Sequence, residues 1–362
     1  MGLAGIILSL VLLMYLAYRG INVLVLAPIL ALVAVAFSGD APLFATYTQV
    51  FMPALGKYLI LYFPVFLLGA IFGKLMDDSG SARVIARWIV DKTGPQRAIL
   101  AIVLACGILT YGGVSLFVVA FAVFPIAAAL FREAAVPKRL IAGAIALGSF
   151  TFTMTALPGT PAIQNAIPMP FFGTTPFAAP GLGIIAGVIM LVGGMLWLDY
   201  RARVAARRGE GYGDDTRATT AGEPPADDPI VASPVGTGDV VPDETVASHA
   251  RPPSAAAVPG FLAAMTPIVL VIALNALFTW VIIPGMDTSY LEQDRYGATN
   301  LQAVRGIWAI IGALVISTAV LILLNLRALT DVKASVNAGT MGSLLPIFNT
   351  ASEVGYGATI AS

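Results

Sequence analysis

One carboxylate lies among hydroxyl and amide side chains in an apolar stretch near the C-terminal end of the sequence. Asn349, Thr350, Ser352 and Glu353 follow Pro346 within a few residues. A carboxylate held away from water favours its protonated form unless a cation pairs with it, and a group poised between the two forms binds and releases protons. We therefore predict that this cluster binds substrate and that Glu353 carries a proton. The alternative is that Glu353 caps a hydrated helix end.

A second polar interruption contains two adjacent glycines. Gly112 and Gly113 are flanked by Tyr111 and Ser115 inside the apolar stretch 98–130. Such a break exposes backbone N–H groups at the start of the following helix, where the helix dipole favours anions. Irregular backbone is tolerated in a membrane where it lines a cavity. We predict that these four residues bind substrate; the alternative is a flexible turn between two packed short helices.

A third interruption follows the apolar stretch 140–157. It carries neutral hydrogen-bonding groups and a Pro-Gly break, and its candidate binding residues are Thr155, Gly159, Thr160, Gln164 and Asn165. Several neutral donors without a fixed charge suit a polyhydroxylated or carboxylate ligand. The threonine hydroxyls of this region can instead bond to carbonyls of their own helix.

The elements that must position these groups are membrane helices. Of 362 residues, 58% are apolar and 11% are charged, against about 25% charged residues in ordinary soluble domains. A spanning helix needs about 20 mostly apolar residues. The sequence therefore predicts an all-α membrane protein. The expected spans are 3–18, 21–37, 58–76, 140–157, 181–198, 261–283 and 305–326, and the stretches 98–130 and 344–362 are apolar but broken, the latter at Pro346.

The composition also excludes several classes of function. The only cysteine, Cys106, and the only histidine, His249, lie in different kinds of sequence, so they form neither a nucleophile pair nor a metal or haem site. The spans hold no nucleophile–base pair, and the chain has no ATP-binding loop. We therefore expect neither an enzyme nor a cofactor, and the zero net charge with no long basic block gives no indication of nucleic-acid binding.

Three connections differ in character. Residues 79–94 predict an amphipathic helix on the membrane, with Arg83 and Arg87 on one face and Trp88 as an interfacial anchor. Residues 199–258 are rich in Pro, Gly, Asp and Thr, which is typical of a disordered linker. Residues 284–304 form a polar loop.

The charge distribution and an internal similarity suggest two inverted repeats. Lys and Arg gather at 83–97, 132–139 and 201–208, which places these segments and the linker in the cytoplasm and the N-terminus outside.

Residues 48–73 resemble 330–355 at an offset of 282, with identities at Thr48/Thr330, Val50/Val332, Pro64/Pro346, Phe66/Phe348 and Gly73/Gly355. An odd number of crossings in the first half inverts the second. We expect a first repeat over 1–198, a cytoplasmic linker over 199–258 and an incomplete second repeat over 259–362.

The motifs resemble those of the gluconate permease (GntP) family of proton symporters, within the ion-transporter superfamily. The resemblance depends on the segments 73–80 and 155–165 and above all on 349–357. It implies re-entrant hairpins whose tips meet the substrate near the membrane midplane. Gluconate carriers of this family tend to have an acidic residue in the first hairpin, where this chain has Tyr111 to Ser115. The resemblance also implies proton-coupled uptake of sugar acids or related hydroxycarboxylates across the bacterial cytoplasmic membrane, with a homodimer as one possible state.

Several alternatives stay open on the sequence. A sodium-coupled, citrate-like carboxylate carrier fits the same neutral polar groups, and proton or sodium is the only co-bound species expected. A channel, or a truncated membrane protein that does not transport, is a rival of another class. Lys74, Asp77 and Asp78 at the end of one span are expected to be interfacial.

Overall fold

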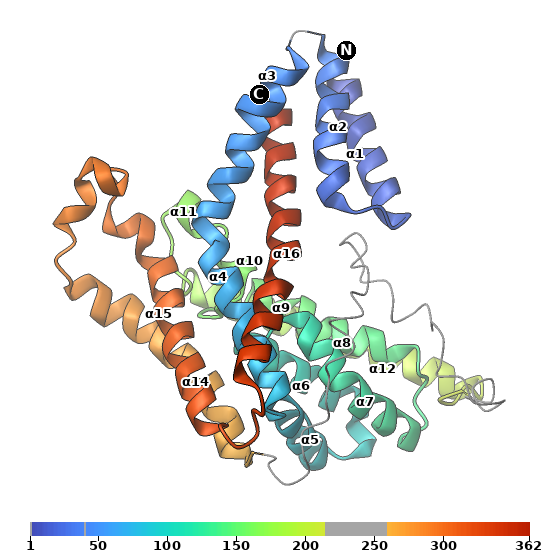
Figure 1. Ribbon diagram of the computed structural model, residues 1–362. Coiled ribbons are helices and arrows are strands. Elements are labelled where there is room, and N and C mark those ends of the chain that lie inside the picture. Colours follow the sequence, from blue (N-terminus) through green and yellow to red (C-terminus); the bar gives the residue numbers. More distant parts are fainter. Residues whose placement is uncertain (1, 40, 214–258) are drawn as a thin grey trace. The chain divides into compact units, whose positions relative to one another are not determined.

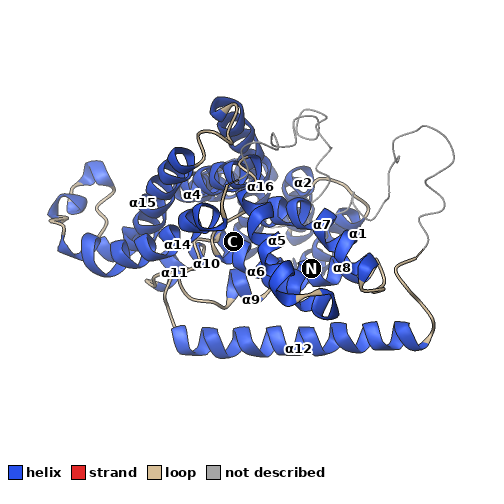
Figure 2. Cartoon of the chain, turned by 90° about the horizontal axis from the view of Figure 1, so that it is seen from below, coloured by secondary structure: helices blue, strands red, loops and turns tan. Residues whose placement is uncertain are grey.

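The computed structural model describes residues 2–39, 41–213 and 259–362, which form helices joined by turns (Figure 2). No strand occurs among these residues, so the predicted all-α class is confirmed. Helices satisfy every backbone polar group within one segment, which an apolar environment demands. The described residues form two compact units. Unit 1 contains those of 1–66 and 341–362, and unit 2 contains those of 67–213 and 259–340.

Unit 1 is built around a helical hairpin. Its helices are α1 (Gly2–Tyr18), α2 (Val23–Ser38), α3 (Leu43–Thr46), the π-helical η1 (Tyr47–Phe51), the first part of α4 (Met52–Asp78) and the last part of α16 (Val332–Ala361). Helices α1 and α2 lie side by side (Figure 1). Leu26, Leu30, Phe51 and Tyr356 form its buried core, and the hydroxyls of Ser9 and Tyr356 lie 2.7 Å apart.

Unit 2 holds most of the helices. They are the remainder of α4 and α16, α5 (Ser81–Thr93), η2 (Pro95–Arg97), α6 (Ala98–Tyr111), α7 (Leu116–Glu133), α8 (Leu140–Phe150), α9 (Phe152–Thr155), α10 (Ile163–Ala166), α11 (Met169–Phe172), α12 (Pro180–Arg207), α14 (Phe261–Leu277), η3 (Phe278–Ile282), η4 (Ile283–Gly285), η5 (Ser289–Glu292), η6 (Asp294–Tyr296) and α15 (Leu301–Leu324). Helix α6 is buried along most of its length and contacts α5, α7 and α8. It is apolar on all sides, as a central helix requires.

Small residues allow a close helix contact in unit 2. A Cβ built on Gly148 of α8 would lie 2.6 Å from the Cβ of Cys106 on α6. Small residues at helix interfaces let backbones approach in a membrane, where van der Waals packing replaces the hydrophobic effect. Helix α12 has the opposite character, since its side chains Leu182, Ile189 and Trp197 are all exposed. Exposed apolar side chains of this kind suit contact with lipid.

Within the part of the chain that the structure describes, four helical segments are long and apolar enough to cross a membrane. They are Leu43–Asp78, Pro180–Arg207, Phe261–Gly285 and Leu301–Leu324, and the pair Ser81–Thr93 and Pro95–Tyr111, bent by 105°, would add a fifth. The expected spans 3–18, 21–37 and 140–157 appear as shorter apolar helices of fewer than 18 residues. The chain is therefore a multi-pass membrane protein by the length and composition of its helices.

The break that was expected at Pro346 is absent. Helix α16 continues through Pro346 and the polar cluster to Ala361, and α4 continues through Pro64. Proline removes one backbone donor but does not end a membrane helix when its neighbours supply the missing contacts. Helix α12 extends to Arg207, so the predicted linker is helical at its start. Residues 214–258 of the predicted linker, with His249, lie outside the described residues.

The predicted helix at 79–94 is present as α5. Ile85, Ala86 and Ile89 form its buried face, whereas Arg87 is exposed. Trp88 stacks on Phe261 at the start of α14, with 4.2 Å between ring centroids. The expected anchor therefore also ties α5 to α14.

Equivalent helices of the proposed repeat run antiparallel in unit 1. Gly355 of α16 packs against Phe51 next to α4, and Thr350 lies beside Tyr58 of α4. Because one position rises along α4 while its partner falls along α16, the two segments point in opposite directions. An inverted repeat requires this relation of equivalent helices. The repeat itself stays a prediction, as does its incomplete second half.

Candidate functional site

The polar interruption at 111–115 is the turn of a helical hairpin. Helix α6 ends at Tyr111, and α7 begins at Leu116. The N–H of Val114 donates to the carbonyl of Leu109, and Gly113 has φ +88°, a conformation that glycine adopts without strain. The 14 residues of α6 are about 21 Å long, short of the roughly 30 Å hydrocarbon core. This length favours a re-entrant hairpin over two full spans.

The interruption at 155–165 is a loop held by its own polar groups. Helix α9 ends at Thr155 and α10 begins at Ile163. Between them Gly159 has φ +84°, and its N–H donates to the carbonyl of Pro176 at 2.7 Å. The Asn165 amide donates to the carbonyls of Thr160 and Pro176 at 3.1 and 3.0 Å. Asn165 therefore fixes the loop through backbone carbonyls that lie outside any helix.

The two interruptions meet. The Tyr111 hydroxyl donates to the carbonyl of Pro158 at 2.7 Å, although 47 residues separate them. A Cβ built on Gly113 would lie 2.7 Å from Cγ of Pro161. The hairpin tip and the Pro-Gly loop thus pack directly on one another, and any side chain at Gly113 would separate them.

Two further helices complete this junction. Gly73 of α4 lies against Ser115, since a Cβ there would be 3.1 Å from the Ser115 nitrogen. Gly112 packs on Ile268 of α14. Asn275 of α14 is fully buried, and its amide donates to the carbonyl of Gly159 at 3.1 Å. Asn275 is not among the binding residues that the sequence predicts. A lone amide in an otherwise apolar span is the signal that could have found it.

A hollow opens beside the loop. It has a volume of about 350 Å³, and its lining includes Thr155, Pro158 and Asn165 from the interruption and Leu182 and Met190 from α12. Small-ligand pockets begin at about 300 Å³. The hollow is therefore large enough for a small organic molecule.

Three threonine hydroxyls of this region bond to helix carbonyls, which is the alternative to ligand binding that the sequence left open. The hydroxyls of Thr151, Thr153 and Thr155 donate to the carbonyls of Leu147, Gly148 and Thr151 at 2.6, 2.8 and 3.0 Å. They therefore satisfy helix carbonyls.

Other polar side chains at the junction do not bond to helix carbonyls of the described residues. Gln164 is exposed, Thr160 is buried with its hydroxyl accepting from the N–H of Ala162 at 3.3 Å, and Ser115 does not cap α7 with its side chain. The start of α7 thus leaves backbone N–H groups at the hairpin tip, as an anion site requires.

The predicted polar cluster at 349–353 lies on α16 in unit 1. Asn349 and Ser352 are buried, and no described residue bonds to the side-chain oxygen of Asn349. Glu353 lies at the edge of that face and is exposed, as is Gly357 one turn later. It is therefore not the fully buried carboxylate that the apolar sequence predicts, because the helical period turns it out of the buried face. Thr350 donates to the carbonyl of Pro346 at 3.0 Å.

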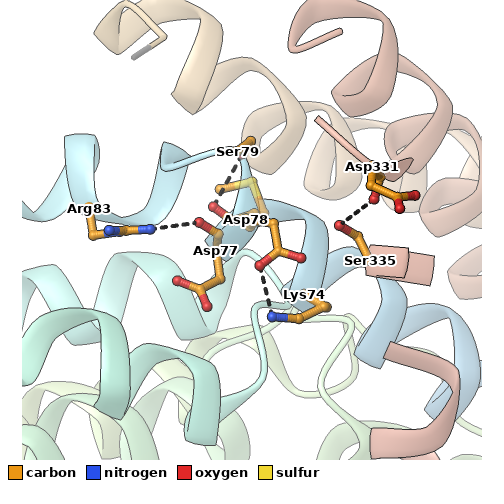
Figure 3. A network of polar contacts seen from close by, with 8 residues as sticks. Lys74, Asp77, Asp78, Ser79, Arg83, Asp331 and Ser335 are labelled. Atoms are coloured by element: carbon orange, nitrogen blue, oxygen red, sulfur yellow. Dashed lines mark hydrogen bonds and ion pairs between the residues drawn. The ribbon is translucent and has the colours of Figure 1, made fainter. Parts of the chain in front are cut away.

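The charged residues at the end of α4 form a corner with α5 (Figure 3). Lys74 pairs with Asp78 at 2.8 Å, and Arg83 donates to the carbonyl of Asp77 at 3.4 Å. The Ser79 hydroxyl donates to that of Ser81 at 2.8 Å. These contacts hold the turn between the two helices and give the cluster a structural role.

Comparison with known proteins identifies the kind of molecule that carries this junction. Residues 1–226 match the family described as GntP family permease. The chain is 44% identical over 370 residues to a protein of Bacillus subtilis (strain 168) named "Uncharacterized transporter YxjC", an alignment that covers 100% of this chain and 73% of that protein. No solved structure matches the chain.

The family match covers both unit 2 interruptions, 111–115 and 155–165. The predicted family resemblance is confirmed, and it indicates a permease in place of an enzyme. The apolar helices, the packed helix breaks and these similarities together show that the chain is a membrane transporter that belongs to the GntP permease family.

Proposed function

We propose that this chain is a secondary active transporter that carries a small organic anion, such as gluconate or a related hydroxycarboxylate, across the bacterial cytoplasmic membrane in symport with protons. The observation that carries the proposal is the direct packing of two helix breaks, 111–115 and 158–161, inside an apolar unit. Transporters bind substrate where broken helices expose backbone groups near the membrane midplane.

The chemistry of the junction suits a hydroxylated anion. The free start of α7 favours a carboxylate through its N–H groups and dipole. Gln164 and Thr160 add neutral groups that can bond to hydroxyls. The predicted residues on α16, Asn349, Thr350 and Ser352, supply more such groups in unit 1, with Glu353 as the proposed proton carrier.

Transport assays in proteoliposomes test this proposal. Radiolabelled gluconate, citrate and simple hydroxycarboxylates are offered under a proton gradient or a sodium gradient. We expect saturable uptake of a hydroxycarboxylate driven by the proton gradient, together with counterflow, which a channel does not show. Uptake driven only by sodium would replace the proton with sodium as the coupling ion. Absence of counterflow for every anion would contradict the proposal.

A substitution of Glu353 tests whether this residue carries the proton. We expect Glu353→Gln to abolish substrate-driven proton uptake, because an amide cannot bind and release the proton, while counterflow of the substrate persists. Glu292→Gln is the matched control, because Glu292 is an exposed carboxylate in the loop before α15. Normal coupling in Glu353→Gln would exclude Glu353 as the proton carrier.

A further inference from the structure

Arg305 is a cation in an otherwise uncharged helix. It is the only charged residue of α15, and the span Phe261–Gly285 against which α15 packs contains none. None of the described carboxylates pairs with it, and it is half-buried. A charge within a spanning segment is costly and marks a functional site unless a partner compensates it.

The backbone of η3, which continues α14, explains how Arg305 is held. Residues 278–282 form a π-helical turn in which the N–H of Ile283 donates to the carbonyl of Phe278. The next residue is Pro284, which has no N–H. Arg305 supplies the missing donor, since its Nε donates to the carbonyl of Thr279 at 2.6 Å. Single π-helical turns within α-helices occur frequently at functional sites.

This contact uses only one of the five guanidinium N–H groups. Both Nη atoms make no hydrogen bond to a residue that the structure describes. Two parallel N–H groups of one guanidinium bind a carboxylate in a planar, bidentate arrangement. Arg305 is thus anchored through Nε while its fork remains for a ligand.

Buried polar groups lead from Arg305 toward the junction of the two helix breaks. Thr279 of η3 and Asn275 of α14 are fully buried about one turn apart, about 6 Å along the continuous helix. The Thr279 hydroxyl and the Asn275 side-chain oxygen have no partner among the described residues. Asn275 in turn holds the carbonyl of Gly159. Unpaired buried polar atoms are rare and call for a ligand or water.

The first turns of α15 contact α11, which follows the loop that carries the predicted site. Gln302 donates to the carbonyl of Gly173 at 3.4 Å, and a Cβ on Gly306 would lie 2.7 Å from the sulfur of Met169. Arg305 lies between these two contacts in the sequence. The segment that follows α11 in turn holds the loop, because the Pro176 carbonyl accepts from Gly159 and from the Asn165 amide.

We propose that Arg305 and the Thr279 hydroxyl form a carboxylate-binding site that holds the anion beside the junction. This inference rests on the proposed function, because it names the fixed positive charge that selects an anion for that function. The predicted neutral groups of the junction then bind the remainder of the molecule. On the predicted topology the site lies toward the outer end of α14 and α15, where an incoming anion arrives first.

Equilibrium binding to the purified wild-type protein and its variants tests the proposal, with radiolabelled gluconate, citrate, lactate and glycerate as probes. For the anion that wild type binds, we expect Arg305→Gln to raise Kd at least about tenfold, or about 1.4 kcal/mol, and Arg305→Lys to raise it less. Thr279→Val removes the hydroxyl without touching Arg305 and should weaken binding by a few fold. Arg295→Gln is the matched control, since Arg295 stacks on Tyr296 in the preceding loop, and its Kd should equal that of wild type.

The possible results separate this site from a structural role and from the proposed function. A wild-type Kd in folded Arg305→Gln, with only a lower melting temperature, would overturn the site and leave the transporter proposal intact. Equal weakening in Arg295→Gln would also overturn it, because a diffuse field would then explain the effect. If Arg305→Gln does not fold, Arg305→Lys and Thr279→Val decide: weaker binding in both supports the site, and wild-type binding in both overturns it. Failure of wild type to bind any of the four anions overturns both proposals.

Discussion

At the scale of single residues, the polar groups of this membrane protein divide between those that bond to the backbone and those whose atoms have no described partner. Tyr111 and Asn165 have the chemistry of binding residues, yet their donors go to loop carbonyls. Thr279 and Asn275 keep buried atoms without a described partner. In an apolar environment every freed carbonyl needs a donor, so many polar side chains near a helix break serve the break itself.

One ion pair outside the membrane spans gives a pH-dependent prediction. Arg139, before α8, donates to Glu210, after α12, through Nε at 2.6 Å and Nη2 at 2.8 Å. This hydrogen-bonded pair lowers the pKa of Glu210 below its ordinary value of 4.5. A lowered folded-state pKa adds stability that is present above the unfolded pKa and is lost as the pH falls through the folded pKa.

We therefore expect Glu210→Gln to lower the melting temperature slightly at pH 7, on the order of 1 °C because the pair is exposed. The difference from wild type should disappear in acid, once the pH is below the lowered pKa of Glu210. Thermal unfolding in detergent at a series of pH values measures this. A difference that grows toward low pH would contradict the assignment.

At the scale of elements, two positive-φ glycines decide where the helices break. Gly113 ends the α6–α7 turn and Gly159 shapes the following loop. Prolines do not have this effect, since α4 and α16 run through Pro64 and Pro346. A left-handed backbone conformation cannot continue a right-handed helix, whereas the φ of proline, about −65°, is helical, and its cost is one lost hydrogen bond and a clash with the preceding turn.

We expect Gly113→Ala to disrupt the packed junction. A left-handed conformation costs an alanine about 1–2 kcal/mol, and its Cβ would meet Pro161 at 2.7 Å. Transport should be lost and the melting temperature should fall by several degrees. Gly69→Ala in α4 is the control, because a Cβ there meets nothing within 4 Å, and it should be neutral or slightly stabilising. Wild-type transport in Gly113→Ala would show that the two breaks need not touch.

At the scale of the whole molecule, the charge distribution makes a prediction about sidedness. The only cysteine, Cys106, is buried, so the natural chain is a suitable background for single introduced cysteines. Gln293 and Arg208 are exposed in two segments that the predicted topology places on opposite sides of the membrane. We expect a membrane-impermeant thiol reagent to label Gln293→Cys in intact cells and Arg208→Cys only after permeabilisation. The reverse labelling would invert the topology, and unmutated protein should show no labelling in either case.

The sequence by itself determined the class of molecule and the places where its helices break. The composition requires a membrane environment for so much apolar surface. The glycines at 112, 113 and 159 predict the two interruptions. Both properties are local, since hydropathy and backbone conformation depend on each residue and its near neighbours. The continuation of α16 through Pro346 was not predictable in this way, because neighbouring segments decide whether a proline ends a membrane helix.

Only the tertiary structure decided which of these groups come together. It joined Tyr111 to Pro158 and Asn275 to Gly159, pairs separated by 47 and 116 residues. It also turned Glu353 to the edge of the buried face and brought Arg305 to the carbonyl that Pro284 leaves without a donor. The physical reason is that a hydrogen bond between distant segments depends on packing that no local pattern encodes. The cation of Arg305 was therefore not connected to η3 by any pattern in the sequence, and only the packing of α15 on this segment brought the two together.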